Sequence, residues 1–143
     1  MEPWPAQVFC DTSFFFACLE AGDAHHAEAL AWLRSCDESG TALWATWEII
    51  SETLTLLRRK CGYRKAAEFA RTVVGALRLA PCDDSVREEA LLVFERFARD
   101  KDLSFCDCLS FVVLTSVVDP MPAATFDRHF KMLGLPVLAA RAR

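Results

Sequence analysis

An abrupt change from apolar to polar residues near the start of the chain constrains the fold most. Residues 8–10 form a short apolar run, Asp11 ends it, and two hydroxyl residues precede a second apolar run at 14–17. A short apolar run fits a buried strand, and Asp followed by Thr or Ser is typical of a helix start. We therefore expect Asp11 at the carboxyl end of a strand, where open α/β sheets build their sites.

The rest of the chain alternates short apolar runs with helical patterns. Strands are predicted at residues 8–10, 42–46, 77–81, 123–126 and 136–138. Helices are predicted at residues 12–20, 24–36, 47–59, 63–77, 85–97, 102–117 and 128–133. This alternation predicts a three-layer α/β/α sandwich with a mostly parallel, five-stranded sheet covered on both faces. The length of 143 residues fits a single domain that spans residues 1–143.

Composition excludes several classes of protein. The chain is 53% hydrophobic and 25% charged, which indicates a globular protein and not a disordered one. No apolar stretch reaches the length of a membrane span, and the N-terminus lacks a signal-peptide pattern, so we expect a cytoplasmic protein. The net charge of −4 argues against a broad basic nucleic-acid surface, but not against a small acidic site that a metal neutralises.

Three other features invite functional interpretations that the sequence does not favour. The seven cysteines are odd in number and include no CxxC pair, so reduced core thiols are expected in preference to zinc ligands or disulfides. Adjacent helical residues point about 100° apart, so His25 and His26 are poorly placed to share one ion. Asp83 and Asp84 are explained as helix caps.

Three further acids stand in positions comparable to that of Asp11. Glu52 lies one turn into the helix after the second strand, Asp107 in the first turn of a very apolar helix, and Asp127 directly after the fourth strand. A solvated helix face would explain Glu52 equally well. Right-handed crossovers bring strand ends to one edge, where four carboxylates would repel one another. Mg²⁺ or Mn²⁺ would resolve that repulsion, activate water and steady the leaving oxygen of a phosphodiester.

The spacing of these acids resembles that of a known family. The relevant segments are VFCDTS at residues 8–13, WEIISE at 47–52, LSFCDC at 103–108 and TFDRHF at 125–130. They resemble the PIN domain, and most of all the VapC-type ribonuclease toxins of bacterial toxin–antitoxin pairs. The resemblance covers nearly the whole chain and implies the strand order 3-2-1-4-5.

The resemblance also implies catalytic and metal-binding roles. Asp11, Glu52, Asp107 and Asp127 would form the catalytic acidic pocket. Asp11, Asp107 and Asp127 would hold Mg²⁺ or Mn²⁺, and Glu52 would hold a second ion or orient the attacking water. Family members often carry another Asp two places after the last one, where this chain has His129. This departure argues against a fully occupied second metal site and is compatible with one ion bound by Asp11, Asp107 and Asp127.

The remaining expectations concern substrate and partners. Thr12 or Ser13 would support the pocket, whereas Arg128 and the basic stretch at 58–65 are candidates for contacts with the RNA backbone. The resemblance further implies homodimerisation and neutralisation by a small antitoxin whose tail occupies the site.

We therefore expect a Mg²⁺- or Mn²⁺-dependent endoribonuclease, the toxin of a toxin–antitoxin pair. The main alternative is a catalytically inactive PIN-like module that binds RNA or a protein partner. A small-molecule phosphatase is disfavoured, because the Asp-x-Asp nucleophile motif expected of such an enzyme is absent at Asp11-Thr12-Ser13.

Overall fold

A four-stranded parallel sheet forms the centre of the protein. The computed structural model describes residues 3–139. The strands are β1 (Gln7–Cys10), β2 (Ala42–Ala45), β3 (Arg78–Leu79) and β4 (Ala123–Ala124), in the spatial order β3-β2-β1-β4. Every pair of neighbouring strands is parallel. The chain thus proceeds from β1 to β3 in one direction and then crosses back to place β4 on the other side of β1.

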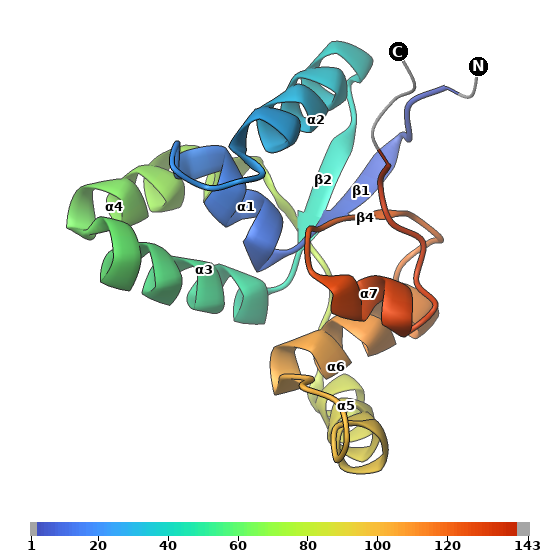
Figure 1. The fold of residues 1–143 in the computed structure, drawn as a ribbon. Helices are drawn as coiled ribbons and strands as arrows, with labels where there is room; N and C mark the ends of the chain where they lie inside the picture. The colour runs from blue at the N-terminus through green and yellow to red at the C-terminus, as the bar shows by residue number, and fades with distance from the viewer. Residues whose placement is uncertain (1–2, 140–143) are drawn as a thin grey trace.

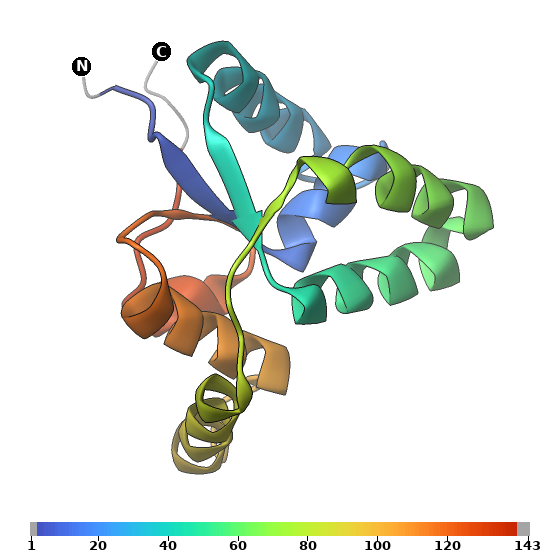
Figure 2. The same cartoon turned by 180° about the vertical axis from the view of Figure 1, so that it is seen from behind.

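Helices cover both faces of this sheet, as the strand and helix pattern predicts. One group comprises α1 (Thr12–Leu19), α2 (His26–Ser39), α3 (Trp47–Cys61) and α4 (Tyr63–Thr72). The other comprises α5 (Asp84–Phe97), α6 (Phe105–Val112) and α7 (Arg128–Met132). Figures 1 and 2 show the two groups on opposite sides of the strands. Right-handed crossovers have this consequence, because the direction of strand addition reverses after β3. The predicted α/β fold class is confirmed.

The predicted fifth strand is reduced to a single bridge, so the prediction of a five-stranded sheet is wrong. In the segment 136–138, Val137 makes one isolated parallel bridge to Ala123. Ala123 N donates to Pro136 O at 2.9 Å, and Leu138 N donates to Ala123 O at 2.8 Å. Pro136 has no N–H to extend the ladder, so pairing stops at one bridge. The bridge nevertheless lies beside β4, where the order 3-2-1-4-5 puts its last strand.

Two predicted helices are also shorter than expected. The helix predicted at 63–77 ends at Thr72 and is followed by a 3₁₀ turn, Val74–Ala76, whose central Gly75 is a poor helix former. The helix predicted at 102–117 begins at Phe105 and passes into a π-helical turn at Val113–Val117. There the Thr115 hydroxyl donates to the Phe111 carbonyl at 2.7 Å and competes with the regular ladder.

The side chains that cap the helices decide where the acids lie. Asp11 and Asp127 are themselves the N-caps of α1 and α7. Ser104 caps α6 and Thr46 caps α3, both at ends of helices that face the same edge of the sheet. A capping side chain must sit at the first turn to accept from free backbone N–H groups, so helix starts bring these residues to the edge.

The cysteines and the apolar helices bear on whether the chain forms disulfides or spans a membrane. All seven cysteines lie within the described residues, and none forms a disulfide. Cys10, Cys36 and Cys108 are buried among apolar side chains. Across residues 3–139, no helix combines the length and apolar character needed to span a membrane.

Candidate active site

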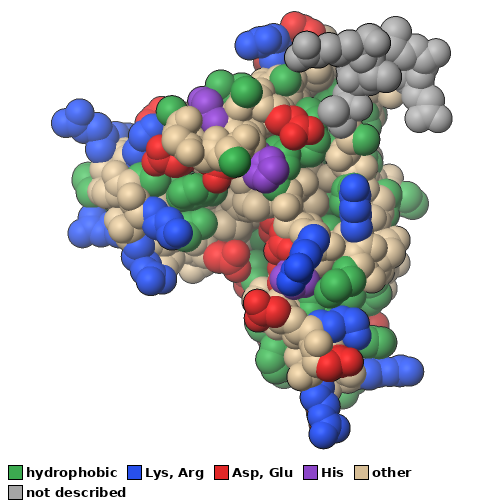
Figure 3. Space-filling view, viewed as in Figure 1, with side chains coloured by type: hydrophobic (Ala, Val, Ile, Leu, Met, Phe, Trp, Pro, Cys, Tyr) green, Lys and Arg blue, Asp and Glu red, His purple; other side chains and the backbone are tan. Residues whose placement is uncertain are grey.

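The site lies where the carboxyl ends of β1 and β4 meet. Cys10 and Ala124 are paired in register, and Asp11 N donates to Ala124 O at 3.1 Å. The chain leaves β1 toward one side of the sheet and enters β4 from the other, so the two following loops diverge and leave a crevice. A cavity of about 370 Å³ opens there, and Asp11, Glu52 and Asp127 all line it. Figure 3 shows acidic side chains gathered around this hollow, with Lys and Arg side chains at its margin.

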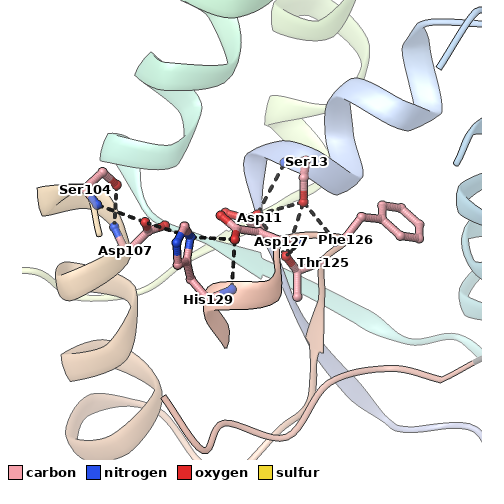
Figure 4. Close-up of polar contacts among 8 residues, drawn as sticks. All are labelled: Asp11, Ser13, Ser104, Asp107, Thr125, Phe126, Asp127 and His129. Atoms are coloured by element: carbon pink, nitrogen blue, oxygen red, sulfur yellow. Dashed lines mark hydrogen bonds and ion pairs between the residues drawn. The ribbon is translucent and has the colours of Figure 1, made fainter. Parts of the chain in front are cut away.

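Asp11 is the most buried acid of the site. Its residue exposure is 6%, and its Oδ2 accepts from Ser13 Oγ at 2.8 Å and from Thr125 Oγ1 at 3.0 Å. Ser13 Oγ in turn accepts from Phe126 N at 3.0 Å, and Thr125 Oγ1 accepts from Asp127 N at 3.0 Å. These bonds, drawn in Figure 4, tie the start of α1 to the loop after β4 and hold Asp11 in one orientation.

Burial raises the pKa of Asp11 to about 6, and the negative charges of Asp107 and Asp127 raise it as well. The hydrogen bonds from Ser13 and Thr125 oppose this effect, since they stabilise the ionised carboxylate. No Lys or Arg side chain forms an ion pair with any of these three acids within residues 3–139. The ionised site therefore holds more negative charge than its own residues compensate.

Asp107 is held in place by the start of α6. Its N–H donates to Ser104 Oγ at 3.0 Å, and its Oδ2 accepts from Ser104 N at 3.0 Å. This reciprocal capping box fixes the side chain while leaving its other oxygen unbonded. Burial raises the pKa of Asp107, the Ser104 N–H lowers it, and the charge of Asp127 raises it.

Asp127 and Asp107 meet at His129. The His129 Nδ1 atom lies 2.7 Å from Asp127 Oδ1 and 3.9 Å from Asp107 Oδ2. One ligand atom from each of these three residues can be chosen so that all lie within 4.8 Å of one another. In Figure 4, Asp107, His129, Asp127 and Asp11 lie in a row that joins α6 to α1. The arrangement offers a cation several oxygen atoms and one nitrogen atom.

Glu52 completes the acidic wall of the cavity from α3. It is exposed and lies near Cys106, whose thiol pKa is raised by burial and then by the charge and hydrogen bond of Glu52. Lys60, two turns further along the same helix, lines the cavity as well. Glu52 thus lies at the open side of the cavity, where it can reach a water molecule or a second cation.

The other predicted residues divide into those at the site and those away from it. Of the two hydroxyls, Ser13 contacts Asp11, whereas Thr12 accepts from Thr53 Oγ1 at 3.2 Å. Arg128 is exposed and lines a neighbouring cavity together with Asp127. The basic stretch is dispersed, because Arg58 lies over the Tyr63 ring and Lys65 donates to the Leu19 carbonyl.

Three residues that contact the acids were not assigned a role from sequence. Ser104 stands three residues before Asp107, a spacing typical of a capping box, so this contact had a readable signal. His129 was noted only as a departure from the family pattern. Thr125, two residues before Asp127, had no local signal, because its contact with Asp11 joins positions 114 apart.

Replacing Thr125 with Val is expected to lower the free energy of unfolding by about 1–3 kcal/mol, because Asp127 N and Asp11 lose a partner. We also expect divalent-metal affinity to fall about 10- to 100-fold, as for other residues that orient a ligand. Urea unfolding and calorimetry measure the two effects. Thr125→Ser keeps the hydroxyl and should resemble the parent; equal losses in both variants would contradict the role of this hydrogen bond.

Comparison with known proteins defines the class of the fold. The sequence pattern of the PIN domain family matches residues 8–134. The chain belongs to the PIN domain family.

Within this family the chain is similar to VapC proteins. It is 31% identical over 127 residues to a protein of Archaeoglobus fulgidus named VapC ribonuclease, covering 85% of this chain and 78% of that one. It is 33% identical over 130 residues to the 23S rRNA-specific endonuclease VapC20 of Mycobacterium tuberculosis, covering 89% and 94%. The crystal structure of VapC20, titled a sarcin–ricin loop cleaving toxin, superposes with a TM-score of 0.75 at 30% identity, covering 92% and 98%. The identification made from sequence is confirmed.

Proposed function

We propose that the protein is a divalent-metal-dependent endoribonuclease, the toxin of a toxin–antitoxin pair. The observation that carries this proposal is the convergence of Asp11, Asp107 and Asp127 at the β1/β4 edge, with no Lys or Arg of residues 3–139 in an ion pair with them. Membership of the PIN family and likeness to VapC ribonucleases support the same reaction class. A metal-dependent nuclease hydrolyses an RNA phosphodiester with a bound cation and a placed water molecule, and this cavity suits both.

The residues present fit a divalent cation. We assign its binding to Asp11, Asp107 and Asp127, as expected from the sequence, with His129 adjacent to the last two. When bound, the ion would polarise the phosphate and lower the pKa of a water molecule. Ser13 and Thr125 keep Asp11 oriented, and Ser104 does so for Asp107. Mg²⁺ and Mn²⁺ both suit carboxylate oxygens, whereas a nitrogen donor from His129 favours Mn²⁺.

Glu52 would act on water or on a second cation, since it faces the cavity from α3, opposite the loop after β4. Lys60, Arg128 and Lys131 line the cavities around the acids and would contact phosphates on either side of the cleaved bond. Only Arg128 and the stretch containing Lys60 were candidates from sequence; Lys131 is added from its position.

Ribosomal RNA is the substrate to test first, since the VapC20 relative is named for 23S rRNA. Purified protein with Mn²⁺ or Mg²⁺ should cut bacterial 23S rRNA at discrete positions, read by primer extension on free RNA and on intact ribosomes. A chelator should stop cleavage, and added metal should restore it. RNA that binds but stays uncut with every divalent ion would identify a binding-only module and refute the nuclease.

Partners and location complete the proposal. A homodimer and a small antitoxin whose tail enters the acidic cavity remain predictions of the family resemblance. A cytoplasmic location would give access to RNA and keep the seven cysteines reduced.

A further inference from the structure

A column of four aromatic rings runs from the core to the surface beside the acids. The Phe14 and Trp32 rings lie 6.2 Å apart at 28°, and Trp32 and Phe126 lie 4.7 Å apart at 10°. Phe126 and His25 lie 4.4 Å apart at 4°, almost parallel. Phe14 and Trp32 are buried, Phe126 is half-buried and His25 is exposed. The column thus ends in a ring that is backed by stacked rings and open to solvent.

This column reaches the surface at the acidic cavity. Phe126 stands between Thr125 and Asp127, so its backbone is part of the loop that holds Asp11. His25 and Phe126 both line the cavity of about 370 Å³ that Asp11 lines. Figure 4 shows the Phe126 ring on the side of the site opposite Asp107, pointing away from the carboxylates. The column therefore flanks the acids without filling the space between them.

The backbone at both outer rings is held by hydrogen bonds. His25 N donates to Asp23 Oδ1 at 2.8 Å, and Phe126 N donates to Ser13 Oγ at 3.0 Å. The plane of the His25 ring is set by its stacking on Phe126, at 4.4 Å and 4°. A preset plane loses little conformational entropy when another flat group stacks on it.

We propose that His25, backed by Phe126, is a stacking platform for one unpaired base of the RNA, next to the phosphate held at the acids. This inference rests on the proposed function. Proteins recognise single-stranded or looped RNA by stacking splayed bases on aromatic side chains, histidine included. The occupant that fits combines a flat aromatic face with a phosphate, because the platform lines the same cavity as two of the proposed metal ligands, Asp11 and Asp127.

Basic side chains on the far side of Phe126 could contact a further phosphate of the bound RNA. A second cavity, of about 630 Å³, is lined by Phe126, by the acids Glu28 and Asp127, and by the basic residues Arg128 and Lys131. Phe126 therefore separates an acidic cavity from one that carries two basic side chains. An RNA strand can place its base on His25, its cleaved phosphate at the acids and an adjacent phosphate on the basic side chains.

The test compares RNA that has bases with RNA that has none. The probes are a fluorescein-labelled octaadenylate and a fluorescein-labelled octamer of abasic ribonucleotides. Binding is measured by fluorescence anisotropy in a buffer that contains Ca²⁺ as the divalent ion. His25→Ala should weaken octaadenylate binding about 5- to 100-fold, the range for loss of one stacked base, and leave abasic binding unchanged. His25→Phe keeps a flat ring and should bind octaadenylate at least as tightly as the parent.

Leu30→Ala is the matched control, because Leu30 is exposed on α2, the helix that His25 precedes, and lines neither cavity. Thermal unfolding of each variant checks that the fold is intact. A His25→Ala variant that binds octaadenylate like the parent, or loses both probes equally, overturns the stacking platform. If the stacking platform is overturned but the parent protein cleaves 23S rRNA, the proposed nuclease stands. A parent protein that neither binds nor cleaves RNA overturns the stacking platform and the nuclease together.

Discussion

Replacing Asp11 with Asn is expected to reduce RNA cleavage by about 10³-fold while the protein stays folded. The loss corresponds to several kcal/mol of transition-state stabilisation supplied through the metal, at about 1.4 kcal/mol per tenfold. Asn keeps one oxygen that can accept from Ser13 and Thr125 but brings no negative charge. Without metal, the variant should be as stable as the parent or more so, because it buries no repelled carboxylate.

Two readouts are needed for this variant, cleavage of 23S rRNA and calorimetric titration with Mn²⁺. Asp83→Asn is the matched control, because Asp83 caps α5 in the same way but is exposed and lies outside the cavity. Asp83→Asn should cleave RNA and bind Mn²⁺ like the parent. An Asp11→Asn protein that cleaves RNA at the parent's rate would remove the catalytic assignment altogether.

Divalent metal should stabilise the protein strongly at pH 7.5 and hardly at pH 5. At an ion concentration about 100 times the dissociation constant, binding adds about 2.7 kcal/mol, or about 5–10 °C in Tm. With Asp11 as the proposed ligand, the ion requires its ionised form, and the pKa of Asp11 is about 6 in the folded protein. Protons therefore compete with the metal as the pH falls below 6.

The metal-free protein should show the opposite trend. The pKa of Asp11 is about 6 in the folded state, against an ordinary value of 3.8. Between these values the folded state binds more protons, so its stability falls as pH rises from about 4 to 6, by at most about 3 kcal/mol. Thermal unfolding with and without Mn²⁺ at each pH isolates the effect. Asp11→Asn should weaken both trends, leaving in the metal-free protein the smaller part that comes from the raised pKa of Asp107. An equal metal effect at pH 5 and pH 7.5 in the parent would contradict the role of Asp11.

The sequence predicted the elements of the fold wherever a local pattern was strong. The apolar run before Asp11 and the Thr46 cap marked β1 and α3, because burial and capping depend on neighbouring residues. The same reasoning failed at residues 136–138, where the apolar residues predicted a strand but Pro136 limited the pairing to one bridge. It also overextended the helix past Val112, since the Thr115 hydroxyl bond to Phe111 was not foreseen.

By itself the sequence determined the class of the protein and predicted which acids form its site. The order and spacing of Asp11, Glu52, Asp107 and Asp127 can be recognised in the sequence, because each acid lies at the end of a strand or in the first turns of a helix. Only the tertiary structure decided what surrounds them. Thr125 on Asp11 and His25 on Phe126 join residues about a hundred positions apart, and such contacts depend on how the sheet closes.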